Sequence, residues 1–172
     1  MLSIPERGLF LHARAGDDRA FADLVEPYRA PIFTTVLRLT ADNATLAERV
    51  HQRTFGRVLL DLQRIDDEAR TTPVVFQAFL ATLVAERVRP VLRAPAPGRQ
   101  TLREAVAAMP HDLSVPLLLS AVVGLRADQI AAIYGIDLEA ARTKLFLARE
   151  QAIGRVGFGD VLGAASTFTF RS

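Results

Sequence analysis

The chain has 172 residues, of which 50% are hydrophobic and 23% are charged, a balance typical of a folded protein and not of a disordered one. Its formal net charge is only +2, so any affinity for nucleic acid must come from local patches of positive charge. It has no cysteine, and its three histidines, His12, His51 and His111, are far apart, so the supply of ligands excludes a disulfide scaffold and a structural zinc site.

The N-terminus carries charge at Glu6 and Arg7 and has no uninterrupted apolar core of signal-peptide length. The most apolar stretch, residues 73–85, is interrupted by Gln77 and is shorter than the roughly 20 residues that span a bilayer. We therefore expect this stretch to be a buried helix, and we expect a cytoplasmic protein without membrane insertion.

Apolar residues recur at helical spacing almost throughout, and no run alternates as a strand would, so we predict an all-α protein. A first helix is expected after the Asp17-Asp18 pair, and a second segment is expected to begin at Pro31 and to end at the polar residues 40–43. The inward side of these two segments is predicted to carry Phe21, Leu24, Val25, Tyr28, Ile32, Phe33, Val36 and Leu37.

Further helices are predicted from about Thr45 to Leu62 and from near Pro73 to about Val88, where Pro90 ends the second of them. The run APAPG at 94–98 cannot continue a helix and favours an extended connector. A short helix ending near Met109 and another over 115–123 follow the connector. The predicted organisation is a helical domain over 1–93, a linker over 94–100, a second helical domain over 101–156 and a tail over 157–172.

Residues 124–149, GLRADQIAAIYGIDLEAARTKLFLAR, have the pattern of a helix-turn-helix. Gly135 permits the turn, and Asp137 is placed to cap the second helix through a backbone N–H near Glu139 or Ala140. Helical spacing predicts that Leu138, Ala141, Leu145, Ala148 and Ala152 face the core. The outer side is then basic and can contact phosphates and guanines through Arg142, Thr143, Lys144 and Arg149, although a helical hairpin with a solvated basic face has the same pattern.

Over residues 12–156 the chain resembles the extracytoplasmic-function (ECF) alternative sigma factors, which have two small helical domains joined by a short linker. In the first domain the resemblance rests on Gly16-Asp17, Phe21, Leu24, Tyr28, Ala47-Glu48, Gln52 and Phe55. In the second it rests on Met109-Pro110, Gly124-Leu125, Gln129-Ile130-Ala131, Gly135, Leu145 and Ala148-Arg149. The order and separation of these motifs, more than any one of them, support the resemblance.

The resemblance implies a transcription initiation factor that binds core RNA polymerase and promoter DNA, without a cofactor or metal and without enzymatic chemistry of its own. The polymerase-facing residues that it implies are Glu48, Arg49, Gln52 and Arg53. The DNA-facing residues are Arg87, Arg89 and Arg93 near the melted promoter element, and Arg142, Thr143, Lys144 and Arg149 on the recognition helix. A solubilising role for the first three arginines fits the sequence as well.

The chain departs from the family pattern at charged positions. Arg49 and Arg53 stand where the family has aspartate and glutamate, which turns acidic contacts with a basic polymerase surface into like-charge contacts. Phe79, Glu86 and Pro90 replace a tryptophan, an asparagine and an aspartate, and Glu86 places a negative charge where DNA phosphates are expected. The recognition helix has fewer basic residues than the family pattern, because Leu147 stands where an arginine is expected. At its start, Glu139-Ala140-Ala141 stand in place of the usual glycine-threonine-valine. Arg49 has an alternative, neutral interpretation, as the partner of Glu48 or Asp42.

These departures favour a second hypothesis, in which the chain keeps the sigma fold as a protein-interaction module, a decoy or adaptor that binds an anti-sigma factor or another regulator and no longer initiates transcription. An enzyme is a third and weaker alternative, because the sequence has no nucleophile elbow and no phosphate-binding glycine loop. The acidic run Asp66-Asp67-Glu68 is interpreted as a solvated loop and not as a metal site.

Overall fold

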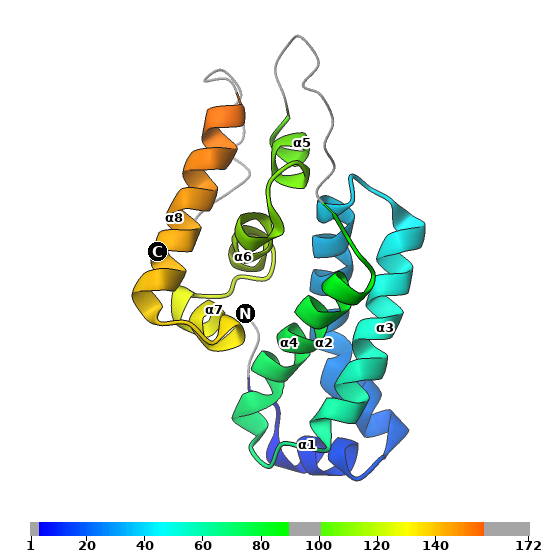
Figure 1. Ribbon diagram of the computed structural model, residues 1–172. Helices are drawn as coiled ribbons and strands as arrows, with labels where there is room; N and C mark the ends of the chain where they lie inside the picture. Colours follow the sequence, from blue (N-terminus) through cyan, green and yellow to red (C-terminus); the bar gives the residue numbers. More distant parts are fainter. Residues whose placement is uncertain (1–3, 90–100, 157–172) are drawn as a thin grey trace.

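The computed structural model describes residues 4–89 and 101–156, and within these ranges the chain is helical and contains no strand (Figure 1). This confirms the predicted all-α class. The N-terminal part contains α1 (Arg7–Arg14), α2 (Asp18–Leu39), α3 (Ala44–Leu62), the 3-10 turn η1 (Glu68–Arg70) and α4 (Thr71–Ala85). The C-terminal part contains α5 (Leu102–Ala107), α6 (His111–Ala121), α7 (Ala127–Tyr134) and α8 (Leu138–Arg155). The predicted linker at 94–98, Pro90 and the tail lie outside the described residues.

Helix α2 begins where the acidic pair predicts. The Asp17 carboxylate accepts hydrogen bonds from the backbone N–H groups of Arg19 and Ala20, both at 2.9 Å, and these bonds lower the pKa of Asp17. The expectation of a new segment at Pro31 is wrong, because α2 continues through this proline to Leu39. A proline removes only its own N–H from the helix, and burial of one face of α2 stabilises the helix on both sides of it.

Helix α1 is not among the predicted elements. It packs against α2 and buries Phe10 and Ala13 in a small apolar cluster with Leu24 of α2 and Leu62 of α3. Its eight residues offer too short a pattern for periodicity to be recognised. The cluster closes the end of the N-terminal part at which α2, α3 and α4 meet α1 (Figure 1).

Helix α4 is the buried helix that the apolar stretch predicts, with Val75, Phe76 and Phe79 fully buried. It ends at Ala85, earlier than expected, and Arg87 follows in the left-handed region with φ 51°. The N–H of Val88 then donates to the carbonyl of Leu83 at 3.0 Å, which closes the helix end. None of the described helices, α4 included, combines the length and apolarity needed to cross a membrane.

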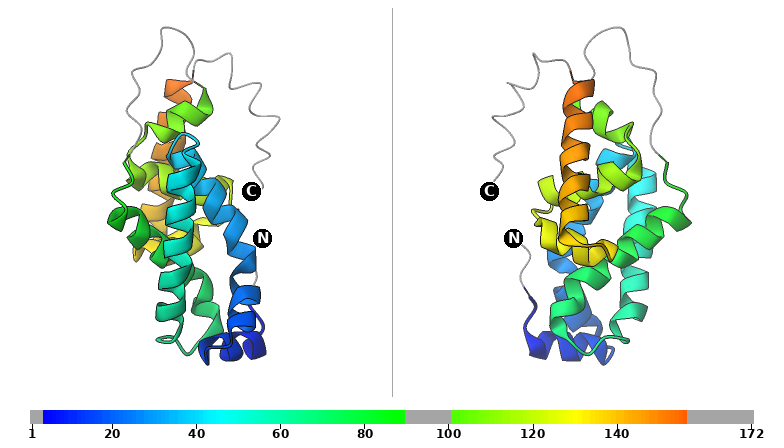
Figure 2. Two further views of the ribbon diagram at one scale, coloured as in Figure 1. Left: turned by 90° about the vertical axis from the view of Figure 1, so that its right-hand side faces the viewer. Right: turned by 60° about the vertical axis from the view of Figure 1, so that its left-hand side comes forward.

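The N-terminal and C-terminal parts pack on each other and share one apolar core. Helix α4 lies against α7, and α2 lies against α5 and α6 (Figures 1 and 2). Two polar contacts cross this junction: the Gln77 side-chain amide donates to the Ile133 carbonyl at 3.4 Å, and Arg103 pairs with Asp42. The division of the chain into a domain over 1–93 and a domain over 101–156 stays a prediction.

Candidate nucleic-acid and protein interfaces

The helix-turn-helix is built by three local features. Gly135 ends α7 in the left-handed conformation with φ 63°, which a residue with a Cβ adopts only at a cost. Asp137 then caps α8, because its carboxylate accepts the backbone N–H of Ala140 at 2.7 Å. Ile130 and Ile133 of α7 are buried beneath α8. The predicted turn and the predicted cap are both confirmed.

Four of the five residues predicted to face the core from α8 do so: Ala141, Leu145, Ala148 and Ala152 are buried. Leu138 is the exception, with 39% of its surface exposed. It is the first residue of the helix, before the α8 axis runs alongside α6 and α5, so little of the core lies within its reach. The predicted seam is therefore right from the second turn of α8 onward.

The outer side of α8 exposes Arg142, Thr143 and Arg149. Arg142 forms an ion pair at 2.7 Å with Glu139, which lies one turn earlier. Phe146, on the same side, is 61% exposed. Lys144 lies differently: it is half-buried on the flank of α8, and its ammonium is 3.9 Å from Asp112 at the start of α6. The cationic surface of this helix is thus formed by arginines, with the lysine set apart from them.

The contact between the N-terminal and C-terminal parts leaves the outer side of α8 uncovered. Helix α8 packs mainly on α5, α6 and α7, and it lies at the left edge of the molecule in Figure 1, away from α3. Its arginines are therefore exposed in the packed arrangement of the two parts.

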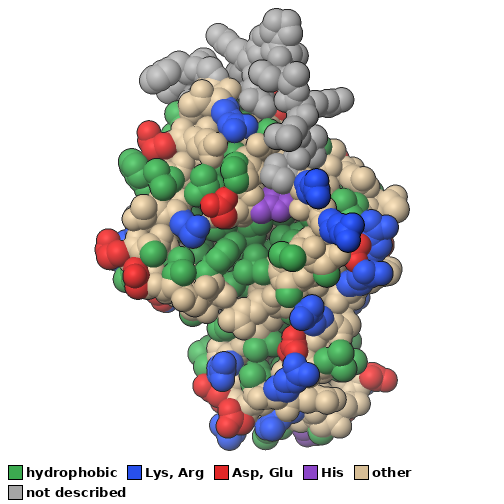
Figure 3. Space-filling model, in the orientation of Figure 1, with side chains coloured by type: hydrophobic (Ala, Val, Ile, Leu, Met, Phe, Trp, Pro, Cys, Tyr) green, Lys and Arg blue, Asp and Glu red, His purple; other side chains and the backbone are tan. Residues whose placement is uncertain are grey.

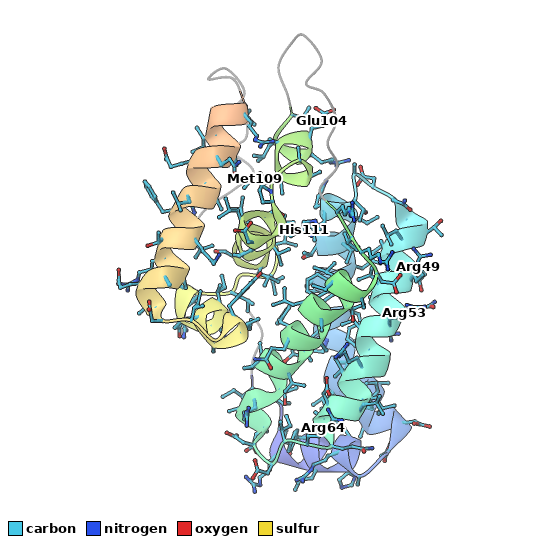
Figure 4. The ribbon with its side chains drawn as sticks, in the orientation of Figure 1. Arg49, Arg53, Arg64, Glu104, Met109 and His111 are labelled. Atoms are coloured by element: carbon cyan, nitrogen blue, oxygen red, sulfur yellow. The ribbon has the colours of Figure 1, made fainter. Side chains whose placement is uncertain are left out.

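The residues predicted to face a polymerase lie on one side of α3. Glu48 and Gln52 are exposed and are hydrogen-bonded to each other at 2.8 Å. Arg49 and Arg53 lie on the same helix, one turn apart, and both point to the end of α4 (Figure 4). The structure thus brings the four residues together on one helix face.

Arg49 and Arg53 share a single carboxylate, that of Glu86. The Arg49 Nε lies 2.7 Å from one Glu86 oxygen, and an Arg53 nitrogen contacts the other. The Glu86 side chain is 6% exposed, whereas those of Arg49 and Arg53 are 54% and 64% exposed. We call these three residues the Glu86 triad; it joins α3 to the C-terminal end of α4.

The triad unites three of the departures from the ECF pattern. Glu86 is held between two guanidinium groups, and Arg49 is paired with neither Glu48 nor Asp42, so the alternative partners considered for it are wrong. The triad itself has two positive charges and one negative charge, and Glu48 on the same face of α3 brings the sum of these four charges to zero. The three substitutions are therefore mutually compensating inside the fold, whatever they do to a partner.

Arg87 and Arg89, predicted to lie near melted DNA, are exposed just beyond α4, one and three positions after Glu86. Arg93 lies outside the described residues. Figure 3 shows positively charged side chains gathered at the right of the molecule, over α3 and the end of α4. These are the second group of exposed arginines besides those of α8.

His51 and the acidic run at 66–68 make contacts within the fold. His51 lies edge-on to Phe33 and Phe55, with ring centroids 5.9 Å and 4.9 Å away, and burial lowers its pKa. In the acidic run, Asp67 caps η1 and Glu68 pairs with Arg7 at 3.3 Å. Among the described residues, no group of three or more potential ligands could hold a metal ion.

No protein-family model matches the sequence, and a search of curated proteins finds no match. Among solved structures, one described as "Structure of CnrH in complex with the cytosolic domain of CnrY" matches with a TM-score of 0.67 and 23% sequence identity. The match covers 92% of this chain and 97% of that chain. CnrH is an ECF sigma factor. The chain therefore has the all-helical fold of this sigma factor over nearly its whole length.

Proposed function

We propose that this chain is an ECF-type sigma factor, a protein that binds core RNA polymerase and directs it to specific promoters. The observation that carries the proposal is the fold of CnrH, matched over 92% of the chain, together with exposed arginines on the helix that a sigma factor uses to read DNA. No chemistry is required of the chain itself, because the polymerase makes the RNA.

In the proposed mechanism α8 enters the major groove of the distal promoter element. Its outer arginines are Arg142 and Arg149. The guanidinium group of each can donate a hydrogen bond to a phosphate, or two hydrogen bonds to one guanine base. Glu139 holds Arg142 in the free protein and releases it when a phosphate or base competes for the guanidinium. Lys144 is expected to contribute mainly to the local positive field, because it lies on the flank next to Asp112.

The proposed polymerase surface is the exposed side of α3, with Glu48 and Gln52 next to the Glu86 triad. The arginines near the end of α4, Arg87 and Arg89, are the residues proposed to follow the single strands of the melted element. Their exposure beyond the helix end supports contact with a phosphate backbone.

The test of the proposal is binding of the purified chain to core polymerase from its own cell, followed by promoter binding of the complex. Arg142→Ala and Arg149→Ala are expected to weaken promoter binding, by about 1–3 kcal/mol for a lost bidentate base contact or with a salt slope lower by about one for a lost phosphate contact. Arg29→Ala, an exposed arginine of α2 paired with Glu26, is the matched control. A folded chain that does not bind core polymerase contradicts the proposal.

A second candidate is a sigma-like interaction module that binds a regulator, as CnrH binds the cytosolic domain of CnrY in the matched structure. The two exposed arginines of the Glu86 triad favour it, because they place positive charges where the sigma factor pattern has acidic contacts with a basic polymerase surface. It predicts that Arg49→Asp with Arg53→Glu raises the affinity for polymerase.

The triad requires a modified design for that experiment. The double substitution alone would surround the buried Glu86 with two further carboxylates and would destabilise the fold. The informative comparison is therefore the triple variant that also carries Glu86→Gln against Glu86→Gln alone. An unchanged or lower polymerase affinity in the triple variant counts against the interaction module.

A further inference from the structure

A groove runs between α3 and α4 on the side of the molecule that carries Arg53 and Arg64 (Figure 4). It is an open groove with a volume of about 410 Å³. Its floor is apolar and includes Gly56 and Leu60 of α3 and Ala85 of α4. A Cβ placed on Gly56 would meet no atom within 4 Å, so the space over this residue is open.

The rim of the groove is cationic. Three arginines line it, Arg53 and Arg57 on α3 and Arg64 just beyond the end of α3, against one acidic lining residue, Asp61. Arg53 also pairs with the buried Glu86, so three positive charges stand against two negative ones. Asp61 lies 3.8 Å from Arg57 and 3.0 Å from Arg64, and each of these ion pairs uses one guanidinium nitrogen. A guanidinium has five N–H donors, so each arginine can also bind a carboxylate from another molecule.

The floor adds an apolar anchor point. Leu60 is 62% exposed although it is a large aliphatic residue, and it lies between the cationic side chains of the rim. Burying such a side chain against a partner is favourable, because it removes apolar surface from water. A single exposed leucine is ordinary on a protein surface, but here it coincides with a groove and with a cationic rim.

We propose that the α3/α4 groove binds an acidic, amphipathic helical segment of a partner protein, whose apolar side chain covers Leu60 and whose carboxylates pair with Arg57 and Arg64. Charge complementarity favours an acidic partner. The apolar floor favours a peptide over a nucleic acid, since a sugar-phosphate backbone offers much less aliphatic surface to cover Leu60 than an apolar side chain does. The proposal goes beyond the proposed function, because Arg57, Leu60 and Arg64 are not among the residues assigned to polymerase or DNA, although Arg53 belongs both to the groove and to the proposed polymerase surface.

The experiment uses three labelled, stapled helical peptides of about 16 residues. The first has glutamates flanking one leucine pair, the second has lysine in place of every glutamate, and the third has alanine in place of the leucines. Binding to the full chain is followed by fluorescence anisotropy at low salt. We expect the acidic peptide to bind, the basic peptide not to bind, and the leucine-free peptide to bind about tenfold more weakly.

The site is tested with Arg57→Gln combined with Arg64→Gln, which is expected to weaken the acidic peptide at least about tenfold. The matched control combines Arg19→Gln with Arg29→Gln on α2, and it is expected to leave binding unchanged. Hydrogen exchange on the unmodified chain, with and without the peptide, gives a second measurement that needs no variant. It is expected to show protection over residues 53–64 and 82–85.

Three results would overturn the proposal: no binding of the acidic peptide, equal binding of the acidic and basic peptides, or protection elsewhere than the groove. Stronger binding of a single-stranded oligonucleotide, lost in the Arg57 and Arg64 variant, would also overturn it and would make the groove a nucleic-acid site. Core-polymerase binding is measured separately on the unmodified chain, so failure here is distinguishable from failure of the proposed sigma function.

Discussion

Glu86→Gln tests the Glu86 triad, because it keeps the shape of the side chain and removes its charge. A hydrogen bond to a charged group contributes about 1.5–3 kcal/mol in protected surroundings, whereas exposed ion pairs contribute about 0.2–1 kcal/mol. Here the carboxylate is 6% exposed but both guanidinium groups are more than half exposed, so about 1 kcal/mol for each contact is reasonable. The expected loss in the free energy of unfolding is therefore about 1–2 kcal/mol.

The assay is urea unfolding followed by far-UV circular dichroism, since the chain has no tryptophan to report by fluorescence. For a protein of this size the expected loss corresponds to a Tm lower by roughly 2–8 °C. Glu48→Gln, at an exposed carboxylate on α3, is the control and is expected to stay within about 0.5 kcal/mol of the unmodified chain. Equal stabilities of Glu86→Gln and Glu48→Gln would refute the reasoning.

Replacing two of the glycines by alanine is expected to change the stability of the fold in opposite directions. Gly135→Ala is expected to lose about 1 kcal/mol of stability in urea unfolding because its φ is 63°, whereas Gly56→Ala, in the middle of α3 with room for a Cβ, is expected to gain about 0.5–1 kcal/mol. A loss in both would contradict this. His111 gives a pH dependence. Burial lowers its pKa in the folded protein, so below about pH 6.5 the unfolded chain takes up the proton first and stability falls as pH falls. His111→Gln is expected to reduce this fall in unfolding midpoints between about pH 7 and 5, and an unchanged slope would contradict the assignment.

The features that the sequence predicts correctly are those that depend on near neighbours in the chain. Asp17 and Asp137 cap helices through backbone groups two or three residues away, and Gly135 makes its turn alone. The all-α class and the seam of α8 follow from apolar spacing that extends over several turns. These predictions need no information about distant parts of the chain.

The features that it misses depend on contacts between distant residues. Arg49 and Glu86 are 37 positions apart in the sequence. From the sequence alone each charge is interpreted as a separate change to a binding surface, whereas in the folded chain the two side chains form an ion pair. Helix α2 runs through Pro31 because its buried face is covered by other helices. Lys144 faces Asp112 for the same reason, since α6 lies alongside α8 only in the folded chain.

The same limit applies to the α3/α4 groove. Arg57 and Leu60 lie on α3 and Arg64 follows just beyond its end, at a spacing typical of a solvated helix face. Only the position of α4, with Ala85 at its end, turns this face into one wall of a groove. A pattern of exposed leucine among arginines at helical spacing is the one local signal that the sequence carries.

In vitro transcription is the test of our proposal that this chain directs RNA polymerase to promoters. Purified chain and core polymerase from the same cell are combined on genomic DNA fragments, and the 5′ ends of the transcripts are mapped. We expect transcripts that start at a small set of sites and that are lost when Arg142 and Arg149 are replaced by alanine. A folded chain that adds no start site to those of core polymerase alone would contradict it.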